Sequence, residues 1–396
     1  MATPFITGLE LARQFHAEVV GPLLDQSFPG ITYSAGLIGW GSDVLGFDSA
    51  RSTDHNWGPR LQVFLAPGDA DRAGEITGLL ASRLPATFRG WPTAFPDATA
   101  ASSEPRHWVD VAELGSWLAG QLGFDPRCGV TLLDWLATPA QRLAEVTAGA
   151  VFHDGLEAAS GAGKADAPGL AGSSPAADGP DGPDGPDGLG GLGTVRSRLA
   201  WYPRDVWLYV LACQWQRISQ EEAFPGRCAE TGDELGSAVV TARLARDLMR
   251  LCLLMRRRYP PYSKWLGTAF AALPLAAGLG PALAGAIAAT SWPECERQLC
   301  AAYETVAGLH NELGITAPLE TTTRLYYTRP FQVIWAGRFT AALRREIADP
   351  LIARLPMTGT ADQFIDSTDA FNDMAWLRTA AAAQLESVQR ILKDVE

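Results

Sequence analysis

Residues 39–58 gather the residue types that could bind a phosphorylated ligand together with a metal ion. The stretch leads from an apolar segment through a Gly41-Ser42 turn into a polar loop that contains Asp54 and Asn56. Because glycine has no Cβ, such a turn lets backbone N–H groups and the hydroxyl approach an anion closely. Side chains alternate between the two faces of a β-strand, so Asp54 and Asn56 would project together from an extended segment. The pattern predicts a phosphate-binding turn beside two oxygen ligands for a hard cation.

Two different kinds of structure must position these residues. Hydrophobic periods before residue 155 predict an amphipathic N-terminal helix, strands at 31–40, 61–65 and 107–111, and a helix at 70–84. Later periods predict helices at 205–220, 235–258, 265–289, 291–313, 330–345 and 361–393. We therefore expect an α+β protein, with an N-terminal mixed α/β domain followed by an all-helical C-terminal domain.

A segment rich in Gly, Pro and Asp separates the two halves. Residues 156–193 include a short Pro-Asp-Gly repeat, a composition that cannot pack a core. This predicts a disordered linker or loop between a domain at 1–155 and a domain at 194–396. The same segment holds a GxGxxG pattern at 188–193, but no predicted strand precedes it, so we do not expect dinucleotide binding there.

Composition limits the partners of the protein. The chain has 396 residues, enough for two domains, and a formal net charge of -12, which argues against nucleic acid as the main partner. None of the 6 cysteines forms a CxxC pair, so neither a zinc ribbon nor a thioredoxin-type site is expected. The sequence has no apolar run of the roughly 18 residues that a membrane-spanning helix needs, and no cationic leader. We expect a cytoplasmic protein with no membrane partner.

The motif at residues 41–65 resembles known proteins. A Gly-Ser turn followed about a dozen residues later by an acid-x-acid segment is similar to the nucleotidyltransferase superfamily of DNA polymerase beta. The same stretch resembles the bacterial family called domain of unknown function 4037, which is assigned to that superfamily. Segments 201–207, 258–265 and 324–331 are also similar to that family, so the resemblance covers most of the chain outside the linker.

The resemblance implies a Mg²⁺-dependent enzyme that moves a nucleoside monophosphate from a nucleoside triphosphate, with ATP the expected nucleotide, to a hydroxyl group. The acceptor would be a small molecule or a protein side chain. Asp54, Asn56 and, from a neighbouring strand, Asp110 are then the expected catalytic and metal-binding residues. Gly41 and Ser42 would bind the triphosphate.

The helical half would supply further nucleotide contacts. By the same resemblance, Tyr262 and Lys264 are expected to bind the nucleotide. Asn56 stands where the superfamily has a second acid, and a neutral amide brings no charge to offset the dehydration of Mg²⁺. An alternative function is therefore a catalytically degenerate, nucleotide- or ligand-binding regulatory protein.

Several other polar residues remain open to two interpretations. Arg51 and Arg60 could contact phosphate or pair with acids, whereas Asp43 and Asp48 are interpreted as turn-forming, solvated acids. His55 is interpreted as a core histidine, and residues 256–258 as a solvated helix end. The last cluster could be an acceptor pocket or could serve packing; it consists of Arg324, Tyr326, Tyr327 and Arg329.

Overall fold

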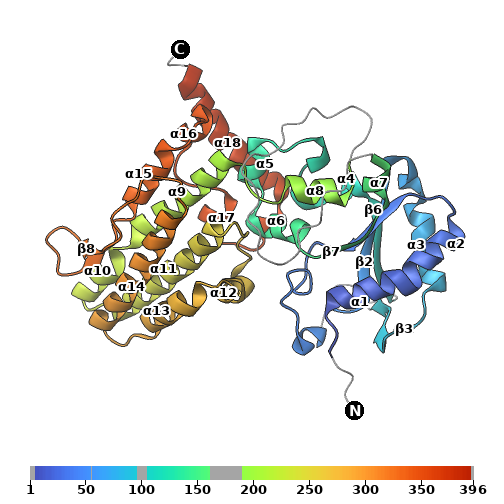
Figure 1. The fold of residues 1–396 in the computed structure, drawn as a ribbon, viewed down its shortest axis with the longest axis horizontal. Coiled ribbons are helices and arrows are strands. Elements are labelled where there is room, and N and C mark those ends of the chain that lie inside the picture. The colour runs from blue at the N-terminus through green and yellow to red at the C-terminus, as the bar shows by residue number, and fades with distance from the viewer. Residues whose placement is uncertain (1–4, 55, 96–104, 161–189, 394–396) are drawn as a thin grey trace. The chain divides into compact units, whose positions relative to one another are not determined.

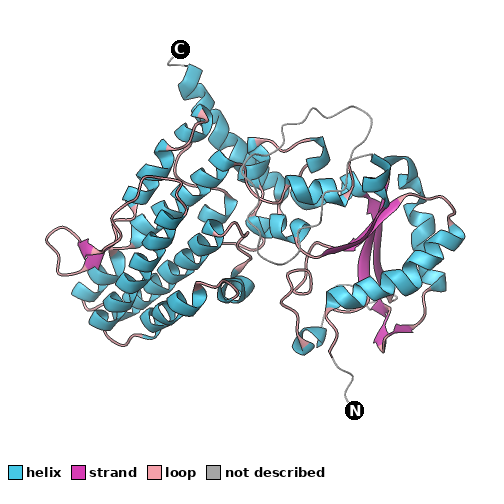
Figure 2. Cartoon of the chain, viewed as in Figure 1, coloured by secondary structure: helices cyan, strands magenta, loops and turns pink. Residues whose placement is uncertain are grey.

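The computed structural model describes residues 5–54, 56–95, 105–160 and 190–393, which form two compact units (Figure 1). The first unit comprises Met1–Val130 and Arg142–Ala200, and the second comprises Thr131–Gln141 and Trp201–Glu396. The expected α+β class is confirmed, because strands gather in the first unit while the second is largely helical (Figure 2). Most of the predicted linker, residues 161–189, lies outside the described residues.

A five-stranded mixed sheet forms the centre of the first unit. Its strand order is β5 (Ala94–Phe95), β6 (Arg106–Glu113), β2 (Arg60–Leu65), β1 (Tyr33–Leu37) and β7 (Ala150–Asp154). β1 runs antiparallel to both β2 and β7, whereas β2 runs parallel to β6. The C-terminal end of β1 therefore lies beside the N-terminal ends of β2 and β6, at one end of the strands.

Helices cover both faces of this sheet. One face is covered by α1 (Gly8–Phe15), a π-helical turn (His16–Val20), α2 (Gly21–Ser27) and α3 (Ala73–Arg83). Leu61, Val63 and Leu65 of β2 alternate onto that face and are fully buried. On the opposite face, Phe64 packs edge-to-face on Trp117 of α4 (Leu114–Leu122), with 5.1 Å between ring centroids.

Short elements complete the first unit. They are 3₁₀ turns at Ala50–Asp54, Pro67–Arg72 and Pro126–Cys128, a hairpin of β3 (Thr87–Phe88) and β4 (Trp91–Pro92), and the helices α7 (Gly155–Ser160) and α8 (Leu192–Arg198). The helix α6 (Ala140–Thr147) belongs to this unit from Arg142 onward. The described part of the GxGxxG pattern opens α8. Its N–H groups donate to the protein's own carboxylates, Gly191 to Glu157 at 2.6 Å and Gly193 to Asp154 at 2.9 Å.

The second unit is a helical bundle. Its helices are α5 (Leu132–Ala137), α9 (Arg204–Glu221), α10 (Phe224–Glu230), α11 (Glu234–Met255), α12 (Ser263–Ala271), α13 (Ala276–Ala288), α14 (Trp292–Glu312), α15 (Gly337–Arg345), α16 (Pro350–Arg354), α17 (Ala361–Phe364) and α18 (Met374–Lys393), with a 3₁₀ turn at Ala370–Asn372. We expected an all-helical domain, and the unit is largely helical. It also contains a short hairpin, formed by β8 (Arg324–Leu325) and β9 (Gln332–Val333). That hairpin shortens the helix predicted at 330–345, and Pro274 lies in the break between α12 and α13.

The centre of the bundle is α9, which is buried around most of its circumference. Trp215 is fully buried and stacks on Phe339 of α15, with ring centroids 4.2 Å apart. A helix that is buried on most of its sides packs inside a bundle. No helix in the described part of the chain has the length and apolar character needed to cross a membrane.

Candidate functional site

The Gly-Ser turn follows β1 at the edge where β2 and β6 begin. Gly39 and Gly41 both have positive φ angles, 87° and 135°, which glycine tolerates without steric cost. A Cβ on Gly41 would lie 2.2 Å from Arg60 Nη2 and 2.2 Å from Asp43 Oδ1, so only glycine fits there without displacing that pair. The side chains of Asp43 and Arg60 therefore restrict which residue can occupy this position of the turn.

A buried ion pair holds the turn against β2. Arg60 Nη2 lies 2.6 Å from Asp43 Oδ1, its Nε lies 3.2 Å from Oδ2, and both side chains are almost fully buried. Arg60 also donates to the carbonyl of Trp40 at 2.9 Å and lies over the Trp40 ring. Arg60 therefore pairs with an acid. The interpretation of Asp43 as a solvated acid was wrong, because burial beside Arg60 supplies its partner.

The turn presents hydrogen-bond donors that the rest of the described chain does not use. The N–H groups of Gly41, Ser42 and Asp43 and the hydroxyl of Ser42 donate no hydrogen bond to any described residue. Gly41 and Ser42 are partly exposed. Consecutive N–H groups at a residue with a positive φ form a concave donor set that suits an anion.

Asp54 and Asn56 are not on a strand, and the prediction that they alternate along one was wrong. Asp54 is the exposed last residue of the 3₁₀ turn Ala50–Asp54, and β2 begins only at Arg60. Asn56 is exposed with a φ of 52°, a left-handed conformation that asparagine tolerates better than most residues. His55 lies outside the described residues.

Asp110 lies in the middle of β6 and is exposed. In the parallel register it is opposite Gln62 of β2, so the two side chains share a face of the sheet. Gln62 is buried and accepts a hydrogen bond from the N–H of Ile38, just before the Gly-Ser turn, at 3.1 Å. Asp110 therefore shares a face of the sheet with Gln62, whose side chain reaches the residue that follows β1.

The donor chemistry of these residues fits Mg²⁺. Asp54 and Asp110 offer carboxylates, Asn56 offers an amide oxygen, and all three side chains are exposed. Within the described ranges, no group of three or more His, Cys, Asp or Glu side chains is placed to hold a metal ion by itself. Mg²⁺ commonly completes its coordination with waters and with the phosphates of a bound substrate.

The other acid of the loop has a structural role. Asp48 accepts hydrogen bonds from the N–H of Gly8 at 2.7 Å and from Trp57 Nε1 at 3.1 Å. It ties the start of α1 to the loop and is only partly exposed, which corrects its interpretation as a solvated acid. Arg51 is exposed on the 3₁₀ turn.

Tyr262 and Lys264 belong to the second unit. Tyr262 precedes α12, is half-buried, and its N–H donates to Gln141 Oε1 at 2.9 Å. Lys264 is exposed, with its Nζ 4.9 Å from the centroid of the Trp265 ring. The basic residues 256–258 are exposed just after the end of α11.

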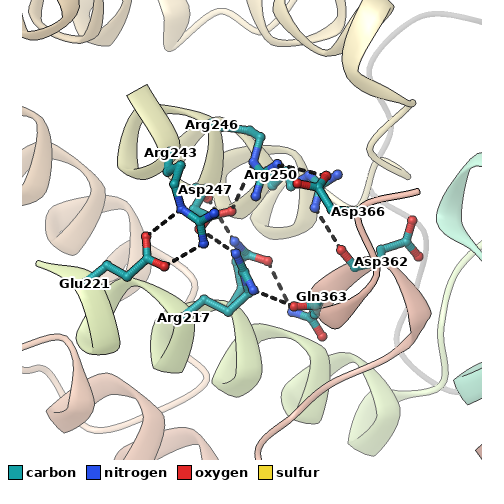
Figure 3. Close-up of polar contacts among 10 residues, drawn as sticks. Arg217, Glu221, Arg243, Arg246, Asp247, Arg250, Asp362, Gln363 and Asp366 are labelled. Atoms are coloured by element: carbon teal, nitrogen blue, oxygen red, sulfur yellow. Dashed lines mark hydrogen bonds and ion pairs between the residues drawn. The ribbon is translucent and has the colours of Figure 1, made fainter. Parts of the chain in front are cut away.

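A second polar cluster joins α9, α11 and the segment that begins with α17 (Figure 3). Arg243 donates two hydrogen bonds to Glu221, at 3.0 and 2.6 Å. Arg217 pairs with the buried Asp247 at 3.3 Å. Arginines also reach the α17 segment: Arg246 pairs with Asp366 at 3.1 Å, Arg250 donates to the carbonyl of Asp362 at 2.8 Å, and Arg217 donates to the carbonyl of Gln363 at 2.6 Å. This network connects three elements of the bundle.

A third feature of the second unit was only partly anticipated. A pocket beside the β8–β9 hairpin is lined by Arg324, Leu325, Tyr327, Trp335 and Arg338. The sequence pattern singled out the Arg324–Arg329 region but missed Trp335 and Arg338, because the hairpin that brings them together has no clear strand signal.

The comparisons with known proteins identify one family. A model of the family described as Domain of unknown function (DUF4037) matches residues 185–266, which contain α9, α11 and most of the charged network. No curated protein and no solved structure matches the chain.

Proposed function

We propose that this chain, which belongs to the DUF4037 family through its residues 185–266, is a Mg²⁺-dependent nucleotidyltransferase. The substrate would be a nucleoside triphosphate, with ATP as the expected nucleotide, and the acceptor a hydroxyl of a small molecule or protein. One observation carries the proposal: the Gly41-Ser42 turn offers unused donors at the sheet edge where β2 and β6 begin.

The residues of the turn would bind and orient the phosphates. The N–H groups of Gly41 and Ser42 and the Ser42 hydroxyl would donate to phosphate oxygens, while the Asp43–Arg60 pair holds the turn in shape. Because Arg60 is already paired and buried, it would act through the turn and not on the phosphate itself.

Asp54, Asn56 and Asp110 are the residues that would hold Mg²⁺. When bound, the ion would offset phosphate charge. In the reaction, the acceptor oxygen bonds to the α-phosphorus, the bond from that phosphorus to the bridging oxygen breaks, and pyrophosphate leaves. The hydroxyl proton goes to solvent or to a base on the acceptor side. For Tyr262 and Lys264, a role as nucleotide contacts stays a prediction from the sequence resemblance.

Pyrophosphate release from each of the four triphosphates in Mg²⁺ tests the proposal. We expect Asp54→Ala and Asp110→Ala to reduce release by about 100-fold or more, since loss of one stabilising group in a reacting centre costs roughly that much. Glu75→Ala is the matched control, because Glu75 is an exposed acid on α3. Equal release by the wild type and Asp54→Ala would remove the catalytic assignment.

A specific observation favours the second candidate, a ligand-binding regulatory protein without catalysis. The left-handed backbone of Asn56 explains an asparagine there without any role in metal binding. Asn56→Asp distinguishes the two functions, because aspartate also tolerates this conformation. Activity that appears only in the variant would indicate a degenerate site. Activity already present in the wild type and not improved by the change would indicate a functional amide ligand.

A further inference from the structure

The pocket beside the β8–β9 hairpin has the size of a small-ligand site. Its volume is about 360 Å³, within the range typical of small-molecule pockets. The hairpin projects at one end of the helical unit (Figure 1). All the residues that line the pocket belong to this unit, so the pocket is complete within one compact unit of the fold.

Two arginines line the pocket, and neither is paired with a carboxylate in the described part of the chain. Arg338 donates to the backbone carbonyls of Ile334 at 2.7 Å, Glu320 at 3.2 Å and Trp335 at 3.3 Å. Arg324 is exposed, and its guanidinium makes no hydrogen bond or ion pair with a described residue. Burial and the neighbouring charge of Arg324 lower the pKa of Arg338. The positive charges of Arg324 and Arg338 therefore both line the pocket.

Two acids lie near the arginines, but their carboxylates accept hydrogen bonds from other groups. Their charges still act on the arginines, because Glu320 and Glu222 oppose the lowering of the Arg338 pKa and Arg324 lowers the pKa of Glu320. The Glu320 carboxylate accepts hydrogen bonds from the N–H groups of Thr321 at 2.9 Å and Thr322 at 3.1 Å. The Glu222 carboxylate is buried and accepts from the N–H of Ala336 at 3.1 Å. An anion in the pocket would therefore be the partner that the two guanidinium groups lack.

Aromatic rings form the rest of the wall. Tyr327 is 70% exposed, and its ring meets that of Trp335 edge-to-face with centroids 4.9 Å apart. Both residues have left-handed backbones, with φ of 55° and 58°, a conformation that bulky residues rarely adopt. Such residues persist where the surroundings hold them, and they concentrate at ligand sites. Glu222 holds this segment by accepting a hydrogen bond from the N–H of Ala336.

We propose that this pocket binds a small molecule that carries a phosphate or carboxylate on a flat aromatic ring. The planar forks of Arg324 and Arg338 match two or more oxygens of such an anion. The exposed ring of Tyr327 and the edge of Trp335 provide apolar surface for the ring of the ligand. The site does not depend on the proposed nucleotidyl transfer, because no residue of the Gly41-Ser42 turn or of the metal set lines it.

Ligand-observed NMR on the full chain tests this site with phenyl phosphate and benzoate as probes. Inorganic phosphate supplies the charge without the ring, and phenol supplies the ring without the charge. We expect one or both aromatic anions to bind at least about tenfold more tightly than either fragment. The stronger of the two identifies the natural anion as a phosphate or a carboxylate.

The variants decide where the probe binds. Arg324→Gln should weaken binding about tenfold or more, and because Arg324 has no described partner the change should leave the fold intact. Tyr327→Ala should weaken the aromatic anions but not inorganic phosphate. Arg329→Gln is the control, since Arg329 lies in the same hairpin but pairs with Glu230 outside the pocket. Asp54→Ala should leave binding unchanged.

Four results would overturn the proposal. The first is that neither aromatic anion binds. The second is equal binding by the wild type and Arg324→Gln, which would place the probe elsewhere. The third is equal affinity for inorganic phosphate and phenyl phosphate, which would mean that the rings take no part. Loss of binding in Asp54→Ala would likewise assign the probe to the triphosphate site.

Discussion

The residue type at several positions of the candidate site is explained by backbone conformation and packing as well as by a possible ligand. Gly41 is needed because the buried Asp43–Arg60 pair packs against its Cα. Asn56 occupies a left-handed position that favours asparagine. The residue types in residues 39–58 suggested a phosphate-binding turn, and the unused donors of that turn support it. The sequence did not reveal that Asp43 is buried, since its partner lies 17 positions away.

The ionisation of Glu222 predicts how the stability of the protein depends on pH. Burial raises the pKa of Glu222 from 4.5 to about 7, although backbone N–H groups and Arg338 oppose the shift. A carboxyl whose pKa is higher in the folded protein stabilises the fold most below its unfolded pKa, and that contribution is lost as the pH rises through the folded pKa. Stability from this group should therefore fall between pH 4.5 and 7.

Urea unfolding of the wild type and Glu222→Gln at several pH values measures this effect. The glutamine cannot ionise, so its stability relative to the wild type should increase by about 3 kcal/mol across that window. Glu75→Gln, at an exposed position on α3, is the control. A constant difference between wild type and Glu222→Gln would show that Glu222 ionises normally.

At the scale of elements, long periodic segments were predicted well and short irregular ones were not. The helices α9, α11 and α14 and the strand β2 were predicted within a few residues of their observed limits. Residues 54–57 were predicted as a strand by alternation, but Asp54 ends a 3₁₀ turn and Asn56 has a left-handed backbone. Over so few residues the hydrophobic pattern cannot distinguish an extended strand from a loop whose position is fixed by distant contacts.

The Asp43–Arg60 ion pair joins the Gly-Ser turn to β2, so removing one partner should destabilise the fold. Asp43→Asn removes the charge that compensates the buried Arg60, and breaking a buried pair from one side costs about 3–5 kcal/mol. Chemical denaturation should show that loss. Glu10→Gln removes one partner of the Glu10–Arg13 pair, which is exposed, so it should cost less than about 1 kcal/mol. Similar small costs for both variants would mean that water reaches the Asp43–Arg60 pair.

At the scale of the whole molecule, the sequence predicted two parts but not where the chain crosses between them. Composition placed the boundary at the Gly/Pro/Asp-rich segment 156–193. In the structure, Thr131–Gln141 already belongs to the helical unit, and the chain then returns to the sheet-containing unit until Ala200. A helix as short as α5 has no pattern that reveals its partner. Its assignment follows from long-range contacts, including that between Asp134 and Arg378 of α18 at 2.5 Å.

The membership of α5 in the helical unit is testable in the full chain by Trp135→Ala. Trp135 is 3% exposed and packs edge-to-face on Tyr202, with ring centroids 5.4 Å apart, so its loss should cost about 3–5 kcal/mol. Hydrogen exchange should accelerate in α18 and at the start of α9, but not in β1 and β2, because contacts within one unit are lost. Trp117→Ala is the matched control and should accelerate exchange around β2 and α4. If Trp135→Ala instead loosened the sheet and left α18 protected, α5 would belong to the first unit.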